Sequence, residues 1–256
     1  MKCGMSRWRC KPTLSPDTMK SLSSLAASAF LLIAAGSIGQ AAQAQGATYI
    51  NPQQIPLGTL LAPPPAAGSA RQQDDLAAVL KVQSSRTPEE VERARADVAK
   101  SVFRFADVLG PAFNEADLPK TAALFKAAGE NATLVAKSGK QYFNRARPFV
   151  SSGEVHPTVP AKQGDAYDSY PSGHATFGYM CAILLAQMVP EKRDALFARG
   201  REYGENRVVD GVHYPSDVEA GRIDGTLVAA ALLTNPTFQT ALAAAKAEVR
   251  AALALN

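Results

Sequence analysis

The segment Ser172-Gly-His-Ala-Thr-Phe-Gly-Tyr-Met-Cys-Ala-Ile-Leu-Leu-Ala-Gln-Met-Val189 decides the fold of this chain of 256 residues. Its residues are apolar nearly all round a helix, which is the pattern of a helix in the middle of a bundle. Serine is a preferred residue at a helix N-cap, so the helix is expected to begin at Ser172. The segment therefore predicts a central helix with other helices packed around it.

Helical spacing of apolar residues extends over most of the remaining chain. Thr87-Pro88-Glu89-Glu90 is a capping box, which predicts a helix from here to about Leu109, where Gly110-Pro111 ends it. The same periodicity predicts helices from Asp74 onward and over residues 118–135, 191–205, 216–233 and 237–255. No run shows sustained alternation of apolar and polar residues, so strands are few or absent. The predicted fold is an all-α, single-domain helical bundle.

The N-terminus has the pattern of a signal peptide, covering residues 1–44. An apolar stretch from Leu25 to Ile38 is followed by Ala42-Gln43-Ala44 and preceded by five basic residues, Lys2, Arg7, Arg9, Lys11 and Lys20. Cleavage is expected before Gln45, and Met19 begins a compact version of the same signal. Because the stretch is short and interrupted by Ser and Gly, we expect export to the periplasm or the medium, without a stable membrane anchor after cleavage.

The composition of the mature chain excludes some classes of protein. Residues 1–44 contain five of the 27 Lys and Arg and one of the 23 Asp and Glu, which leaves 22 of each. This balance gives no support for binding to nucleic acid. Cys181 is the single cysteine after residue 44, so no intrachain disulfide is expected. Residues 45–70 are rich in proline and predict an extended arm, followed by the functional domain over residues 71–256.

Three short segments carry groups suited to binding an oxyanion. Ser172 and Gly173 open the central helix, whose free N–H groups and positive end form an anion site. Lys140 and Arg147 lie seven residues apart and can neutralise different oxygens of one phosphate. A solvated basic helix face, with Arg145 as a further member, is the alternative for this second segment.

The third segment, Arg207-Val-Val-Asp-Gly-Val-His213-Tyr-Pro-Ser-Asp217, adds a cation and a histidine–aspartate pair. The carboxylate of Asp217 lies four residues after His213, near a predicted helix start, and can reach one ring nitrogen of the imidazole. Such a bond fixes the tautomer, which makes His213 a candidate nucleophile and Asp217 the residue that orients it. A structural His–Asp pair beside a turn is the alternative.

Together the segments resemble the three-part signature of the phosphatidic acid phosphatase type 2 (PAP2) superfamily. Lys140 to Pro148 matches its K-x6-R-P part and Pro171 to His174 matches P-S-G-H. The third part, S-R-x5-H-x3-D, matches at Arg207, His213 and Asp217 but has Asn206 in place of serine. Asparagine keeps a hydrogen-bond donor, so this departure concerns positioning and not the class of reaction. The surrounding residues are most similar to secreted bacterial class A non-specific acid phosphatases.

The resemblance implies a fold of the PAP2 and vanadium haloperoxidase type and a role for each matching residue. His213 is the nucleophile that forms a phosphohistidine, His174 is the general acid and base, and Asp217 orients His213. The phosphate oxygens are bound by Lys140, Arg147, Ser172, Gly173 and Arg207. The scheme needs no metal and no cofactor, and its substrates are small phosphate monoesters.

Two other functions use the same residues. A vanadate-dependent haloperoxidase holds vanadate in the same oxyanion pocket, and an exported phosphate-binding protein keeps the pocket without turnover. The binder has no need of a nucleophile with its orienting carboxylate, which favours the enzyme. The sequence does not select one phosphate ester over another, and the alanine-rich C-terminal helix leaves room for a homo-oligomer.

Overall fold

A computed structural model describes residues 48–160 and 164–255 of the chain. By its internal contacts the chain divides into two units, residues 1–43 and 44–256, and the described residues all belong to the second. The predicted signal peptide lies outside the described residues.

The described residues are helical and contain no strand, so the predicted all-α class is confirmed. The body of the unit consists of the helices α5 (Pro119–Phe143), α7 (Gly173–Met188), α8 (Arg193–Val209), α9 (Pro215–Thr234) and α10 (Pro236–Ala252). The other helices are α1 (Leu57–Leu60), α2 (Ala70–Ser85), α3 (Pro88–Ala96), α4 (Ala106–Leu109) and α6 (Pro148–Ser151), with short 3-10 turns η1 (Pro52–Gln54), η2 (Val102–Phe105), η3 (Asp165–Tyr167) and η4 (Pro190–Lys192).

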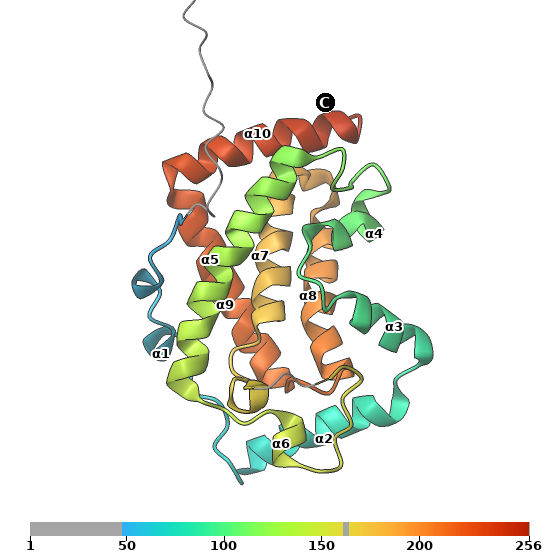
Figure 1. Ribbon diagram of the computed structural model, residues 1–256, viewed down its shortest axis with the longest axis vertical. Coiled ribbons are helices and arrows are strands. Elements are labelled where there is room, and N and C mark those ends of the chain that lie inside the picture. Colours follow the sequence, from blue (N-terminus) through green and yellow to red (C-terminus); the bar gives the residue numbers. More distant parts are fainter. Residues whose placement is uncertain (1–47, 161–163, 256) are drawn as a thin grey trace, which may run out of the picture. The chain divides into compact units, whose positions relative to one another are not determined.

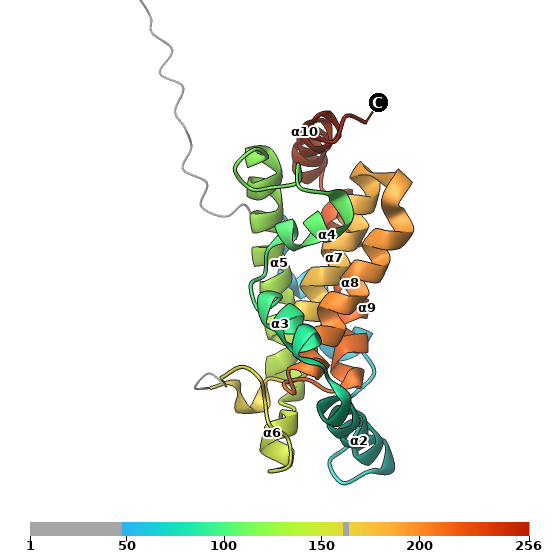
Figure 2. The ribbon, with the colours of Figure 1, turned by 90° about the vertical axis from the view of Figure 1, so that its right-hand side faces the viewer.

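Helix α7 is the central helix, as its sequence predicts. It contacts α5, α8, α9 and α10, and it runs alongside α5, α8 and α9 while α10 lies across one end (Figures 1 and 2). Helices α2 and α6 lie at the opposite end, near the start of α7. The loops that carry the three sequence segments all lie at this second end.

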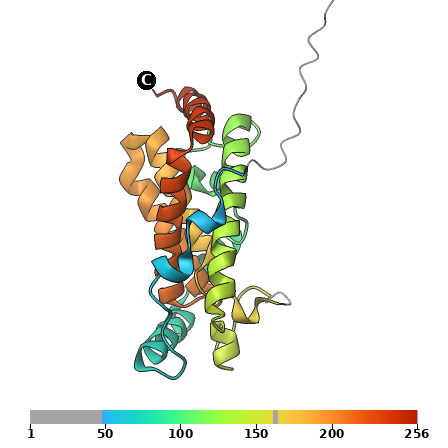
Figure 3. The same ribbon diagram turned by 90° about the vertical axis from the view of Figure 1, so that its left-hand side faces the viewer.

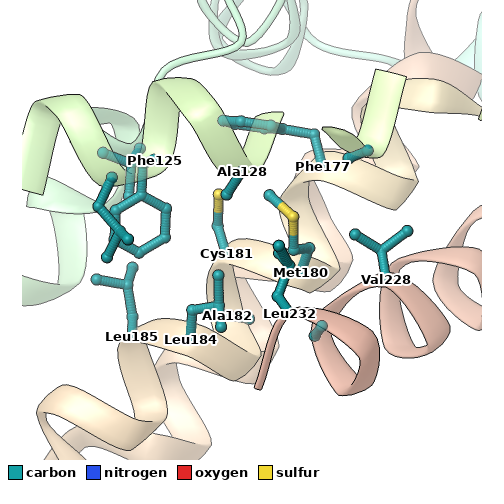
Figure 4. Packing of buried hydrophobic residues seen from close by; sticks show 14 of the residues in the cluster. Phe125, Ala128, Phe177, Met180, Cys181, Ala182, Leu184, Leu185, Val228 and Leu232 are labelled. Atoms are coloured by element: carbon teal, nitrogen blue, oxygen red, sulfur yellow. The ribbon is translucent and has the colours of Figure 1, made fainter. Parts of the chain in front are cut away.

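Apolar side chains on every side of α7 form the core. Met180, Cys181, Leu184 and Leu185 are fully buried, and they pack with residues of α5 and α9 such as Phe125, Val228 and Leu232 (Figure 4). Burial of side chains of this size stabilises a fold by roughly 1.5–3 kcal/mol each. The core therefore fixes the position of α7 and of the residues at its N-terminus.

Residues 48–69 differ from the extended arm that their composition predicts. Ile50, Ile55, Leu57 and Leu61 are buried in the main core, and the backbone N–H groups of Tyr49 and Ile50 donate to Asn131 Oδ1 at 3.0 and 2.9 Å. The segment lies across α5 and α9 (Figure 3). Its prolines prevent a long helix, but apolar residues between them attach it to the bundle.

The single helix predicted from Thr87 to about Leu109 is wrong. The capping box at Thr87 is present, but α3 ends at Ala96, and η2 and α4 follow only after a loop. The break occurs at Asp97, whose carboxylate is completely buried and bonded to arginines of other segments. Tertiary contacts of one charged residue therefore override the helical periodicity.

No single helix among residues 48–160 and 164–255 has both the length and the apolarity needed to cross a membrane. Helices α9 and α10 meet that composition only when taken together, and they are bent by 96° relative to each other.

Candidate active site

The three sequence segments meet around one cavity of about 540 Å³. Four of the residues singled out in the sequence line it, namely Arg147, His174, Arg207 and His213. The remaining wall is mostly apolar and consists of Val98, Phe149, Val159, Pro160 and Val212, with Arg95 beside them. The cavity thus combines a cationic floor with walls that lower the local dielectric constant.

His213 lies in the loop between α8 and α9, where both of its ring nitrogens have partners. Nδ1 is 3.3 Å from Asp217 Oδ2, and Nε2 is 3.2 Å from Arg147 Nη1. A guanidinium can only donate, so Nε2 is the acceptor and Nδ1 carries the proton. Burial, together with the charges of Arg147, Lys140 and Arg207, holds the pKa of His213 well below its usual value. The imidazole is therefore neutral, with a lone pair on Nε2.

Asp217 lies in the first turn of α9 and is completely buried. Besides His213 it accepts hydrogen bonds from Arg145 Nη1 at 2.6 Å, from Ser169 Oγ at 2.6 Å and from the backbone N–H of Tyr214 at 2.8 Å. These donors keep the carboxylate in a single orientation. Asp217 can therefore hold the His213 ring and stabilise positive charge on it.

Arg145 and Ser169 were not identified as site residues from the sequence. Arg145 is buried between Asp217 and Asp75. Its Nη2 donates to Asp75 Oδ2 at 2.8 Å, and the guanidinium of Arg145 lies 4.2 Å from the centre of the Tyr214 ring. It is therefore not part of a solvated basic face. Its partner Asp75 is 70 residues away in the chain, so spacing alone gives no signal for the pair.

Lys140 and Arg147 are joined by Asp168. Lys140, in the last turn of α5, donates to the backbone carbonyl of Asp168, and Arg147 Nε donates to Asp168 Oδ1 at 2.8 Å. Arg147 Nη1 also donates to the carbonyl of Val212 at 2.8 Å. Burial, then the charge of Arg147, lowers the pKa of Lys140 to about 8. Two cations of one segment are thus held at fixed positions beside His213.

The N-terminus of α7 lies close to two lysines, Lys100 and Lys140. The Ser172 side chain caps the helix by accepting from the backbone N–H of Ala175, and Gly173 is the first helical residue. A Cβ atom added at Gly173 would lie 3.4 Å from Lys100 Nζ and 3.9 Å from Lys140 Cε. The absence of a side chain lets an anion approach the first N–H groups of this 16-residue helix.

His174 and Arg207 complete the cavity. His174 Nε2 lies 3.1 Å from the carbonyl oxygen of Val98. Burial, then the charges of Arg207 and Lys100, lowers the pKa of His174 well below its usual value. Arg207 Nη1 donates to Asp210, whereas the buried Arg207 Nε finds no acceptor in the part of the chain that the structure describes. The Nε atoms of Arg145 and Arg199 are likewise buried without a hydrogen-bond acceptor among the described residues, so this feature does not by itself mark the cavity.

Asn206, the departure from the family signature, is not among the residues that line the cavity. Its Nδ2 donates to Asp97 Oδ2 at 2.7 Å. Asn206 therefore contacts the loop at Asp97 and not the cavity. Within residues 48–160 and 164–255, no group of three or more His, Cys, Asp and Glu is placed to hold a metal ion.

The cavity of this helical bundle is thus lined by two histidines and three arginines, Arg95, Arg147 and Arg207, a set of side chains suited to a phosphate-like oxyanion. The chain belongs to the PAP2 superfamily, whose family model matches residues 121–240.

Relatives over most of the chain place it near the bacterial non-specific acid phosphatases. The non-specific acid phosphatase of Providencia stuartii is 36% identical over 206 residues, which cover 77% of this chain and 82% of the relative. The acid phosphatase of Zymomonas mobilis is 32% identical and covers 75% of each chain. These similarities confirm the family resemblance that the three segments predict.

A bacterial vanadium-dependent iodoperoxidase shares the fold, with a TM-score of 0.53 and 17% identity. The match covers 68% of this chain and 52% of that structure. The predicted bundle of the PAP2 and vanadium haloperoxidase type is therefore confirmed.

Proposed function

We propose that this protein is an exported acid phosphatase that hydrolyses small phosphate monoesters through a phosphohistidine on His213. The observation that carries the proposal is the state of the His213 ring, which Asp217 and Arg147 fix from opposite sides. Its neutral Nε2 faces a cationic cavity, which is what attack on phosphorus requires. The curated relatives named as acid phosphatases support the same reaction class.

In the first step Nε2 of His213 attacks phosphorus and the bond to the ester oxygen breaks. The electron pair of that bond goes to the leaving oxygen, which takes a proton from His174. Asp217 stabilises the positive charge that develops on the His213 ring. In the second step His174 accepts a proton from water and the water oxygen attacks phosphorus. The bond between phosphorus and Nε2 breaks, its electron pair returns to Nε2 of His213, and phosphate is released.

The cations stabilise the negative charge of the transition state. Lys140, Arg147 and Arg207, with Ser172 and the N–H of Gly173, surround the equatorial oxygens where charge must be stabilised. Burial, then the charges of Arg207 and Lys100, lowers the pKa of His174. A bound phosphate group brings negative charge to the site and raises this pKa again, so His174 gains its proton together with the substrate.

Export and independence of metals belong to the proposal as well. The signal-like pattern of residues 1–44 supports export to the periplasm or the medium. The catalytic scheme assigns every step to a side chain of this protein and uses no cofactor. Activity is therefore expected to survive treatment with EDTA.

The test is rapid mixing of the exported protein, starting at Gln45, with p-nitrophenyl phosphate. The expected result is a burst of p-nitrophenol, one equivalent per site at most, with acid-labile phosphate left on the protein. The variant His213→Ala should show neither while still binding inorganic phosphate. Absence of turnover on every ester of a broad panel would instead favour an anion-binding protein.

Vanadate distinguishes the proposed phosphatase from a vanadate-dependent haloperoxidase, the alternative whose fold this protein shares. Inhibition of ester hydrolysis by vanadate supports the phosphatase. Oxidation of halide by peroxide in the presence of vanadate, without ester hydrolysis, would contradict it. The same panel of esters would identify the preferred substrate.

A further inference from the structure

The loop between α3 and η2 forms the wall of the cavity that contacts His174. The carbonyl of Val98 lies 3.1 Å from His174 Nε2. A carbonyl oxygen only accepts, so Nε2 keeps its proton in both charge states of the ring. Nδ1 is then the nitrogen that exchanges a proton with the leaving group. The position of the Val98 carbonyl therefore determines which way His174 faces.

The residue before Val98, Asp97, accepts hydrogen bonds from three side chains. Asp97 is completely buried and accepts from Arg199 Nη1 and Nη2 at 2.9 and 2.6 Å, from Arg104 Nε at 2.9 Å and from Asn206 Nδ2 at 2.7 Å. Burial alone would raise the pKa of Asp97, but the hydrogen bonds and charge of Arg199, together with the hydrogen bonds from Arg104 and Asn206, outweigh it and lower the pKa. The carboxylate is thus ionised and fully bonded.

The residue after Val98 is held too. The Tyr203 hydroxyl donates to the carbonyl of Ala99, and the Tyr203 ring stacks on His174 with 6.4 Å between ring centres. Arg199, Tyr203 and Asn206 are spaced by four and three residues on α8, so they lie on one face of that helix. This face of α8 therefore holds the loop by hydrogen bonds to Asp97 and Ala99, the residues on both sides of Val98.

We propose that Asp97, which is hydrogen-bonded to Arg199 and Asn206 of α8, is a positioning residue. Through the adjoining carbonyl of Val98 it orients His174 for protonating the leaving group. The inference rests on the proposed phosphatase function, because it assigns a role within that reaction. It also gives Asn206 a function. The amide reaches the Asp97 carboxylate from a position next to Arg207, and so links the phosphate site to the loop that holds the acid.

The test compares two esters that differ in their need for an acid. An alkyl ester such as glycerol 2-phosphate needs a proton on its leaving oxygen, whereas 2,4-dinitrophenyl phosphate does not. The readout is kcat/KM, which reports the transfer of the phosphoryl group to His213 and not the later hydrolysis of the phosphohistidine. The variant Asp97→Asn is expected to lower kcat/KM for the alkyl ester about 30-fold or more, because general acids contribute about 10²–10⁴-fold. The kcat/KM for the dinitrophenyl ester should change less than about threefold.

Inorganic phosphate provides an independent readout. Its inhibition constant should stay the same in Asp97→Asn, since Lys140, Arg147 and Arg207 are untouched. The matched control is Asp107→Asn, because Asp107 also contacts Arg199, at 3.4 Å from its Nε, but does not adjoin Val98. The control should show no selective loss on the alkyl ester.

Asn206→Ala keeps the inference testable if Asp97→Asn does not fold. It removes one of the hydrogen bonds to Asp97 and should show the same selectivity to a smaller extent. An equal loss on both esters, or no loss on either, would overturn the inference. Failure of the parent protein to hydrolyse any ester would instead contradict the proposed function, so the two failures are distinguishable.

Discussion

The imidazole of His213 lies between a carboxylate and a guanidinium, and this placement sets the pH range of the reaction. Burial and the charges of Arg147, Lys140 and Arg207 hold the pKa of His213 well below its usual value of about 6.5. The nucleophile must be unprotonated, so activity should persist in acid. The acid limb of kcat/KM is therefore expected below about pH 6.5, as in a bell-shaped profile.

The alkaline limb of this profile depends on groups that must carry a proton. Lys140 loses its charge as the pH rises through about 8, and His174 must also be protonated in the complex. The measurement is kcat/KM from pH 3.5 to 9.5, corrected for ionisation of the substrate. His156→Gln is the control, since His156 is an exposed histidine away from the cavity. A rate that still rises at strongly alkaline pH would contradict the assignment of roles.

Asp224 of α9 is a buried carboxyl group outside the catalytic scheme. Its Oδ2 lies 2.8 Å from Thr176 Oγ1, which is also 3.0 Å from the carbonyl of Ser172. The hydroxyl has one proton and cannot donate to both acceptors. Burial raises the pKa of Asp224 to about 7. A protonated Asp224 that donates to Thr176, while Thr176 donates to Ser172, satisfies all three groups.

Asp224→Asn should therefore stabilise the protein at high pH and not at low pH. The folded-state pKa is raised, so between about pH 4 and 7 the folded state binds the proton more tightly than the unfolded state, and the stability of the parent falls as the pH rises. The asparagine variant lacks this loss. Urea unfolding at pH 8 should show a gain of about 2–4 kcal/mol relative to pH 4. An equal gain at both pH values would contradict a protonated Asp224. So would the same gain in Asp194→Asn, a variant of an exposed carboxylate.

At the scale of elements, the local sequence predicts the helices well but does not predict buried polar residues whose partners are distant in the chain. Helices α7 to α10 begin and end within a few residues of their predicted limits, because caps and prolines mark their ends. Four motif residues also line one cavity, and the family resemblance of the motifs, not their separation along the chain, groups them in the prediction. Asp97, Arg145 and Ser169 escape prediction because each acts through partners about 50 to 100 residues away.

Close contact between α7 and α8 depends on glycine. A Cβ atom added at Gly200 of α8 would lie 2.7 Å from Ala182 Cβ and 2.9 Å from the carbonyl oxygen of Gly178. Gly200→Ala should push the two helices apart and cost about 1–3 kcal/mol of stability. Since α7 carries His174 and α8 carries Arg207, activity should fall as well.

Thermal unfolding and steady-state kinetics test this packing prediction. Gly153→Ala is the matched control, because a Cβ atom at Gly153 meets nothing within 4 Å. It should leave both Tm and kcat nearly unchanged. If Gly200→Ala behaved like the control, glycine at this crossing would have no role in spacing the helices.

At the scale of the whole molecule, the proline-rich segment before α2 is part of the folded unit. Four of its apolar side chains are buried in the main core, namely Ile50, Ile55, Leu57 and Leu61. The carbonyl of Ala62 accepts from the Tyr170 hydroxyl at 2.7 Å. Tyr170 immediately precedes the Pro171-Ser172-Gly173-His174 motif. The segment therefore supports both the core and the approach to the phosphate site.

Removal of this segment should leave the protein at the limit of stability. A chain that starts at Pro63 loses four buried apolar side chains, worth about 6 kcal/mol or more, against a total stability of about 5–15 kcal/mol for a typical domain. A chain that starts at Thr48 is the control and should unfold like the parent.

Asn131→Ala is a milder test that keeps the full segment. The variant leaves the N–H groups of Tyr49 and Ile50 without their acceptor and should cost about 1–3 kcal/mol of stability. Urea unfolding measures all three proteins. If the chain from Pro63 matched the control in midpoint, the segment would be an appendage, and its burial against α5 would contribute nothing to the fold.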